Sequence, residues 1–251
     1  MIKIENVTKV YGRTVAVESL TLEVNAGEVF GLLGPNGAGK TTTLKMLAGL
    51  LIPTSGTMTV DGHDAQKDPV AAKRVIGFVP DKPFIYEKLS GREFLEFVRE
   101  VFRVEGDPAA LARQERLIKM FMLEGWMDEL VESYSHGMRQ KLIITSALTH
   151  HPKALIIDEP MVGLDALGMR QVKGLFRELA DGGSTVLVST HTMAIAQEVC
   201  DRIAILNKGK IVAMGTMDDL SRQAHMAGED LETIFLKLTE PGYRPESRPP
   251  L

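Results

Sequence analysis

The sequence lacks most of the features that would suggest a disulfide-bonded or nucleic-acid-binding protein. Its 251 residues include a single cysteine, Cys200, which excludes an intramolecular disulfide framework and suits a reducing cytosolic compartment. Lysine and arginine number 29 against 33 aspartate and glutamate residues, so the formal net charge is −4. Without a basic excess to neutralise phosphates, we expect no nucleic-acid partner.

Long apolar runs are also missing. No stretch approaches the roughly 18 uninterrupted apolar residues that a membrane-spanning helix needs. Near the N-terminus, Lys3, Glu5 and Lys9 interrupt any apolar core of a signal peptide. Any association with a membrane is therefore expected to come through a partner.

The most informative stretch that is present follows the apolar run 29–33 and fits the pattern G-x-x-x-x-G-K-[ST]. It consists of Gly34, Pro35, Asn36, Gly37, Ala38, Gly39, Lys40 and Thr41, with Thr42 directly after it. Glycines let backbone N–H groups approach phosphate oxygens, and a helix beginning near Lys40 presents its unpaired N–H groups to the anion. Lys40 would supply charge to the β- and γ-phosphates, and Thr41 a hydroxyl to Mg²⁺. The stretch predicts a nucleoside triphosphate site.

Hydrophobic patterning predicts two kinds of sheet. Period-two alternation within 2–24, and again at 57–60, predicts antiparallel strands. Three later runs, 154–157, 185–188 and 203–206, are wholly apolar and alternate with helical segments. Such runs indicate a parallel sheet that is covered on both faces.

Helical periodicity dominates from about 90 to 151. Apolar residues share one face over 94–102, and Asp107-Pro108 supplies an N-cap and a first-turn proline for a second helix. We interpret this region as a helical insertion between the two sets of strands. An amphipathic segment follows at 231–238.

Two adjacent carboxylates, Asp158 and Glu159, end the apolar run that precedes Pro160. An ionised pair at the end of a buried strand is unfavourable unless a cation meets it. In phosphate-loop ATPases that cation is Mg²⁺, held by the first carboxylate, usually through water. Glu159 would then be free to polarise or deprotonate an attacking water. Taken alone, the pair is better explained as a solvated turn; with the phosphate loop, it favours a hydrolytic site.

A third element, Tyr134-Ser135-His136-Gly137, starts a helix and by itself indicates only an N-cap. The element becomes informative through its position relative to the other motifs. It follows the phosphate loop and the helical insertion, and lies about 20 residues before Asp158-Glu159, which Gly163-Leu164-Asp165 and then Ser189-Thr190-His191 follow. This order resembles that of ATP-binding-cassette (ABC) ATPases over residues 1 to about 220.

The resemblance implies an α/β fold with a phosphate-loop ATPase core: a mostly parallel sheet, an N-terminal antiparallel β layer and an inserted helical subdomain. We expect an ABC ATPase domain at 1–220, containing the helical subdomain at about 82–152. A C-terminal helical extension is expected at 221–239. The last segment, 240–251, holds four prolines and is predicted to be disordered.

The resemblance also implies the parts of an ATP site. Tyr11 would stack on adenine, and residues 34–42 would hold the phosphates of ATP. Ser135 and Gly137 would bind the γ-phosphate of an ATP held by a second cassette, so ATP would join two subunits. Asp165 would lie at the subunit junction.

The implied catalytic residues are Glu159, His191 and Lys40, with His191 contacting the γ-phosphate and helping to fix the water. Thr41 and Asp158 would hold Mg²⁺. Asp81 stands where most of the family has a glutamine that reaches the metal or the water. Aspartate can accept a hydrogen bond from metal-bound water but cannot donate one, so direct metal contact at Asp81 is an open question.

The third motif departs from the family pattern in two places. His136 replaces the usual first glycine, and Met138 replaces a glutamine-like position. His136 adds bulk and a titratable group next to an anion site. Together with Asp81, these residues look like those of cassettes from bacterial exporters of drugs, lipids or polysaccharides rather than from nutrient importers.

These motifs predict the ATP-hydrolysing subunit of an ABC transporter that works as a pair of cassettes, either homodimeric or heterodimeric. It would drive a separate polytopic membrane subunit, as a peripheral protein on the cytoplasmic face of the membrane. Residues 81–103, with Phe84, Ile85 and Tyr86, are the predicted docking region, although internal packing of these three side chains is an equal alternative.

Two other functions fit the sequence less well. A soluble ABC-type ATPase acting on a nucleic-acid or ribosomal machine is the main alternative, but such relatives usually carry two cassettes or a long coiled-coil insertion, and neither is seen here. A small-molecule kinase would leave the segment 135–140 and His191 unexplained.

Overall fold

The computed structural model describes residues 1–82, 84–226 and 228–240 and contains two sheets. Apart from its first residue, the segment 240–251 predicted to be disordered lies outside the described residues. The strands are β1 Ile2–Tyr11, β2 Thr14–Val24, β3 Val29–Leu33, β4 Ser55–Val60, β5 His63–Asp64, β6 Ile76–Val79, β7 Ala154–Asp158, β8 Thr185–Thr190, β9 Arg202–Asn207 and β10 Lys210–Gly215.

The smaller sheet is the predicted antiparallel layer. Its strand order is β2-β1-β4-β5, and β1 pairs antiparallel with both β2 and β4. Ile2, Ile4 and Val7 on β1 are buried, as the alternating pattern requires of the face toward the core. The prediction that the segment at 57–60 joins this layer is confirmed.

The larger sheet has the order β10-β9-β3-β8-β7-β6, in which β3 pairs parallel with β8 and β9, and β7 pairs parallel with β6 and β8. Its central strands are buried along their whole length. Alternate residues of β7 enter opposite cores: Ile156 packs toward α1 and the small sheet, and Leu155 and Ile157 pack with the helical region. The apolar runs therefore form a sheet covered on both faces.

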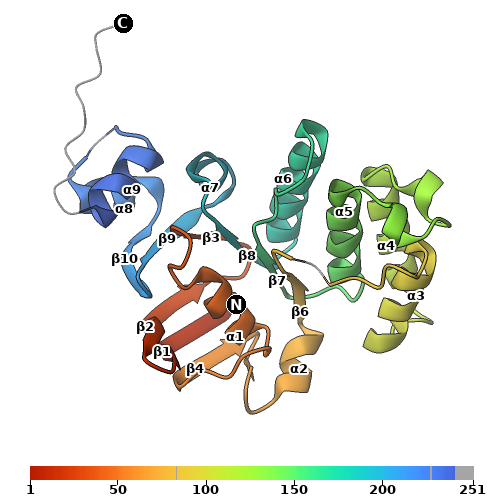
Figure 1. Cartoon of the computed structure of the whole chain (residues 1–251), viewed down its shortest axis with the longest axis horizontal. Coiled ribbons are helices and arrows are strands. Elements are labelled where there is room, and N and C mark those ends of the chain that lie inside the picture. The colour runs from red at the N-terminus through yellow and green to blue at the C-terminus, as the bar shows by residue number, and fades with distance from the viewer. Residues whose placement is uncertain (83, 227, 241–251) are drawn as a thin grey trace, which may run out of the picture.

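Helices surround this sheet, and Figure 1 shows α3, α4 and α5 grouped beyond β6 while α8 and α9 lie beyond β10. They are α1 Lys40–Leu47, α2 Pro69–Arg74, α3 Gly91–Phe102, α4 Pro108–Met120, α5 His136–Leu148, α6 Ala166–Asp181, α7 Met193–Val199, α8 Met217–Ala224 and α9 Leu231–Thr239. Within the described part of the chain, none of them combines the length and apolarity of a membrane span. The expected subdomain boundaries remain a prediction.

Local signals fix the starts of the inserted helices. Ser90 and Glu93 form a capping box at α3, and Asp107 accepts a hydrogen bond from the backbone of α4, whose first residue is Pro108. Short 3₁₀ turns at Glu124–Trp126 and Val131–Ser133 lead from α4 to α5. The buried amide of Gln114 on α4 donates to the Leu95 carbonyl on α3 at 3.2 Å and to Thr149 Oγ1 after α5 at 2.8 Å, so one polar side chain links the three helices.

His150, just after α5, joins the helical region to the large sheet. Its ring stacks on Phe102 of α3, and Nε2 donates to the Ile76 carbonyl of β6 at 3.0 Å. Nδ1 is buried without a hydrogen-bond partner, as suits a neutral ring. Burial lowers the pKa of His150 from 6.5 to about 4, although the hydrogen bond to Ile76 acts in the opposite direction and raises it.

This lowered pKa predicts a specific loss of stability in acid. The unfolded chain takes up a proton at His150 below pH 6.5 and the folded chain only near 4, so stability is full above 6.5 and falls as the pH drops. Lowering the pH from 7.5 to 5 should remove about 2 kcal/mol through this residue alone. His150→Phe should keep the stacking and abolish that loss, at a cost of about 1 kcal/mol at pH 7.5 for the lost hydrogen bond.

Urea unfolding at both pH values measures this difference. His225→Asn, at the exposed end of α8, is the matched control and should retain the wild-type pH dependence. Parallel losses in wild type and His150→Phe between the two pH values would show that His150 titrates normally in the folded chain.

Candidate functional site

A cavity of about 320 Å³ opens at the carboxyl end of β3, where the phosphate loop leads into α1. Parallel strands place their carboxyl ends at one edge of a sheet, so the segments following β6 and β7 reach the same place. The cavity is lined by Ala16, Pro35, Asn36, Gly37, Ala38, Gly39, Lys40, Thr41, Thr42, Asp81 and Glu159. The structure thus brings most of the predicted phosphate-binding residues together with Asp81 and Glu159.

The loop backbone has the shape that an anion cradle requires. A Cβ on Gly34 would overlap the Leu206 carbonyl oxygen, and one on Gly39, whose φ is 106°, would lie 2.5 Å from the Ala16 carbonyl oxygen. Gly37 has a φ of 80° and open space where its Cβ would be. Glycine is therefore needed at Gly34 and Gly39 for packing and at Gly37 for its left-handed backbone. These residues fit a phosphate chain.

Lys40 is buried at the start of α1 with its ammonium held by the loop. Nζ donates to the Gly34 carbonyl at 2.7 Å and to the Pro35 carbonyl at 3.3 Å. Burial lowers the pKa of Lys40, and the carboxylates of Glu159 and Asp158 oppose that shift. The two backbone carbonyls therefore hold the Lys40 ammonium group beside the loop.

Thr41 and Asp158 form a hydrogen-bonded pair between α1 and β7. Thr41 Oγ1 donates to Asp158 Oδ2 at 2.6 Å, and the Ser189 hydroxyl donates to the other carboxylate oxygen. Asp158 is only 2% exposed, and the two hydroxyls supply hydrogen bonds to the buried carboxylate. A hydroxyl beside a carboxylate at the end of the phosphate loop is a donor set that suits Mg²⁺.

Glu159 is held in a strained position next to the loop. Its φ of 51° is left-handed, and its N–H donates to the Ser189 carbonyl at 2.9 Å. One carboxylate oxygen lies 2.8 Å from His191 Nδ1, and the other accepts from Thr190 Oγ1 at 3.3 Å. Because an ionised carboxylate only accepts, this contact assigns the N–H to Nδ1. His191 and Thr190 together fix the direction in which Glu159 points.

Three residues of the site, Ser189, Thr190 and Ala16, have no role that the sequence motifs predict. Ser189 and Thr190 end β8, and the parallel register places Ser189 beside Asp158. The Ser-Thr-His triplet was a visible signal, but its first two residues acquire partners only when β7 and β8 become neighbours. Ala16 comes from β2 of the small sheet, and no sequence signal marks it.

Four predicted ligand residues lie away from this cavity. Tyr11, at the end of β1, is 45% exposed and has the Lys9 ammonium 5.0 Å from its ring centroid. Ser135 caps α5 by accepting from the Met138 N–H, with Gly137 in the first turn. Asp165 caps α6 by accepting from the Gly168 N–H at 2.9 Å. None of the four lines the phosphate cavity.

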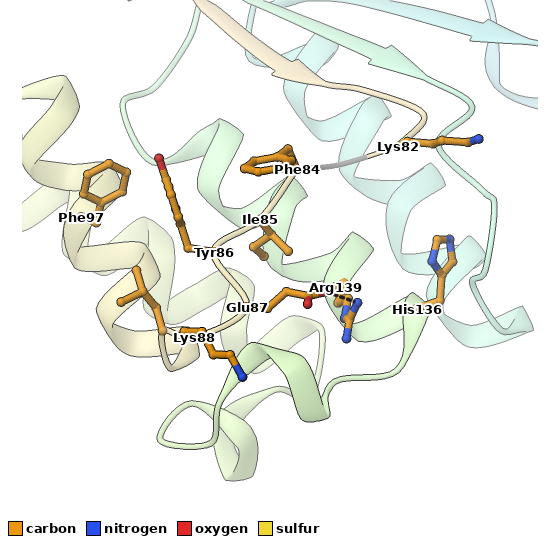
Figure 2. Close-up of a pocket in the computed structure, with 10 residues that line it drawn as sticks. Lys82, Phe84, Ile85, Tyr86, Glu87, Lys88, Phe97, His136 and Arg139 are labelled. Carbon is orange, nitrogen blue, oxygen red and sulfur yellow. Dashed lines mark hydrogen bonds and ion pairs between the residues drawn. The ribbon is translucent and has the colours of Figure 1, made fainter.

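A larger groove of about 920 Å³ lies between the segment after β6, α3 and the start of α5 (Figure 2). It is lined by Lys82, Phe84, Ile85, Tyr86, Glu87, Lys88, Leu89, Phe97, His136 and Arg139. Phe84 is 89% exposed, and Tyr86 lies edge-on to both Phe84 and Phe97. Ile85, in contrast, is buried in the core. The two aromatic residues are therefore exposed, as a docking region requires, whereas Ile85 is packed internally.

Comparison with known proteins matches residues 17–162 to a family described as ABC transporter. The chain is 37% identical over 220 residues to the linearmycin resistance ATP-binding protein LnrL of Bacillus subtilis, covering 88% of this chain and 70% of that one. Among solved structures, an ATP-binding subunit of an ABC transporter superposes with a TM-score of 0.90 at 32% identity, covering 95% of this chain and 99% of that one. A dimeric ATP-binding cassette with bound ADP and Pi gives 0.76 at 26% identity, covering 86% and 99% respectively.

Proposed function

This chain belongs to the ABC transporter family as an ATP-binding ATPase subunit, and we propose that it powers export through a separate membrane subunit. The assignment of ATP hydrolysis to this site rests on one observation: Lys40, Glu159 and Asp81 line the same cavity. Beside it, Thr41 is hydrogen-bonded to Asp158, and His191 to Glu159. The export direction is supported by the similarity to a linearmycin resistance ATP-binding protein.

ATP binding is proposed to use the loop backbone and Lys40. N–H groups from residues 36–42 would surround the phosphates, and Lys40 would exchange its carbonyl partners for phosphate oxygens. Thr41 and Asp158 would hold Mg²⁺, which when bound offsets charge on the phosphate oxygens. Lys40 and the backbone donors are already in place, so they need little reorganisation as charge develops.

Water activation is assigned to Glu159. Its carboxylate lines the phosphate cavity and is aimed by His191 and Thr190, so it can orient a water and accept its proton. Asp81 lines the same cavity from the end of β6 and can only accept hydrogen bonds when ionised. We propose that it accepts a hydrogen bond from a bound water.

A second cassette is proposed to complete each site. Ser135, Gly137 and Asp165 lie at starts of helices outside the chain's own phosphate cavity, so they are available to another copy. Helix starts offer unpaired N–H groups, which suit a γ-phosphate. The similarity to a dimeric cassette with bound ADP and Pi supports the pairing of two cassettes. Tyr11 is proposed to stack on adenine.

The groove beside α3 is proposed to receive a cytoplasmic segment of the membrane subunit, which would hold this chain at the cytoplasmic face. Its floor is apolar and aromatic, from Ile85, Tyr86 and Phe97, and Lys82 and Lys88 stand at its edges (Figure 2). A short helix with one apolar face and an acidic end matches that combination.

Co-purification tests this proposal directly. The tagged chain, isolated from membranes under mild conditions, should bring a polytopic membrane protein with it. Phe84→Ala should weaken that association about thirtyfold, because an exposed aromatic anchor is typically worth about 2 kcal/mol on binding. Val70→Ala, another exposed apolar side chain, lies on α2 outside the groove and should have no effect. Recovery with ribosomes or DNA instead of a membrane protein would defeat the transporter proposal.

A further inference from the structure

The start of α5 is tied closely to the loop that runs from Glu159 to Asp165. Gln140 Nε2 donates to the Pro160 carbonyl at 3.5 Å, and Lys141 Nζ lies 3.7 Å from Asp165 Oδ1. A Cβ on Gly137 would lie only 2.6 Å from the Gly163 carbonyl oxygen. The loop begins at the carboxylate assigned to water activation, so contacts along it bear on where that carboxylate sits.

His136 makes the tightest of these contacts. Its imidazole lies against Gly163: a Cβ there would overlap Cδ2 of the ring and lie 2.9 Å from Nε2. Gly163 also has a left-handed φ of 78°. The ring fills the space that any side chain at Gly163 would need, so the two residues form a complementary pair. Neither the predicted ATP contacts nor the docking groove by itself accounts for this pairing.

The same ring also forms part of the groove wall. Figure 2 shows His136 rising from the start of α5 on the side of the groove that Lys82 borders, one turn before Arg139. Arg139 is fixed by Glu87 at 2.7 Å and by the Glu132 carbonyl at 2.9 Å, so the groove wall next to His136 is held in place. His136 is therefore in contact with the loop on one side and with the groove on the other.

We propose that His136 is a positioning residue for ATP hydrolysis: its ring, seated on Gly163, sets the loop from Glu159 to Asp165 according to what occupies the groove. The shape of the ring carries the effect, since a glycine here would leave Gly163 uncovered and the loop free to shift. The contact with the loop stands on the geometry alone, and only the link to the groove rests on the proposed membrane partner.

A double-mutant cycle on the isolated chain tests the contact. His136→Gly should lower kcat about fivefold and leave KM for ATP within about twofold, because the phosphate loop is untouched. Gly163→Ala should lower kcat about thirtyfold, because the new Cβ overlaps the ring and also strains the left-handed backbone, and only the first of these is relieved by removing the ring. The double variant should then be at least about threefold more active than Gly163→Ala alone. If it falls a further fivefold or so, the two effects add and the proposal is overturned.

Two further variants separate shape from charge and from general damage. His136→Gln keeps a flat side chain without a titratable group, and should retain kcat within about twofold with the wild-type pH profile. A loss as large as that of His136→Gly would overturn a role for shape. His225→Gly, at an exposed left-handed helix end, is the matched control and should behave as wild type. If Gly163→Ala does not fold, folding replaces kcat as the readout. The double variant should then fold, and a double variant that stays unfolded would count against the contact.

The proposed coupling between the groove and the loop is measured in the complex with the membrane subunit. The ratio of partner-stimulated to basal turnover should fall toward one in His136→Gly and stay at the wild-type value in His225→Gly. An unchanged ratio in His136→Gly would overturn that link. If no membrane subunit binds, the proposed function fails, whereas the cycle on the isolated chain still decides whether His136 positions the loop.

Discussion

Glu159→Gln is expected to lower steady-state ATP turnover by at least about a hundredfold while ATP affinity stays within about twofold. Glutamine has nearly the same shape and can still contact Thr190 and His191, so the left-handed turn and the cavity are preserved. It cannot accept a proton from water at neutral pH, so the chemical step stops. Because ATP would join two cassettes, the variant should accumulate as an ATP-bound dimer.

Steady-state ATP hydrolysis, nucleotide binding and size-exclusion chromatography with ATP measure the turnover, the ATP affinity and the dimer. Glu115→Gln, on the exposed face of α4, makes the same chemical change away from the site and should leave all three unchanged. Unimpaired turnover in Glu159→Gln would remove this residue from water activation. Lost ATP affinity would mean that it mainly supports the phosphate loop.

Mixing two inactive variants should restore activity if each site is shared between two copies of the chain. Lys40→Ala removes the cation of the phosphate loop, and should lower turnover about a hundredfold or more. Ser135→Asp should be similarly inactive, because the added carboxylate would face the γ-phosphate of the partner's ATP. Aspartate still serves as an N-cap for α5, so the helix start should survive.

In a one-to-one mixture, about half of the dimers pair one variant with the other, and each such dimer has one intact site and one doubly altered site. Turnover should therefore recover to about a quarter of the wild-type value. Ser135→Asp that hydrolyses ATP normally would place Ser135 outside the ATP site. Two inactive variants that give no recovery, although they form mixed dimers, would argue against a site divided between the copies.

The parts of the site that the sequence predicted are those with a local signal. The phosphate loop is a continuous segment whose glycines have a backbone role, and the structure gives Gly37 and Gly39 the left-handed angles that this role demands. Helix starts were equally readable: Asp107 and Ser135 accept the backbone hydrogen bonds that an N-cap makes. Such features depend only on residues that are close in the chain, so they can be predicted before the fold is known.

Other features depend on which strands become neighbours, and no local pattern encodes that. Periodicity identified β7 and β8 as buried strands, but their parallel pairing is what places Ser189 and Thr190 against Asp158 and Glu159. Ile85 reads like its exposed neighbours Phe84 and Tyr86, and only the packing of the helical region shows that its side chain faces inward.

The sequence by itself determined that this protein is an α/β ATPase of the ABC transporter family, because its motifs are short segments whose chemistry and order are specific. Only the tertiary structure decided how the part of the ATP site that one chain supplies is built. It shows that His191 orients Glu159, that Ser135 does not line the phosphate cavity of its own chain, and that the His136 ring packs on Gly163. These are contacts between residues far apart in the chain or in separate elements. They arise from strand order and close packing, which fix positions in space that residue types alone do not specify.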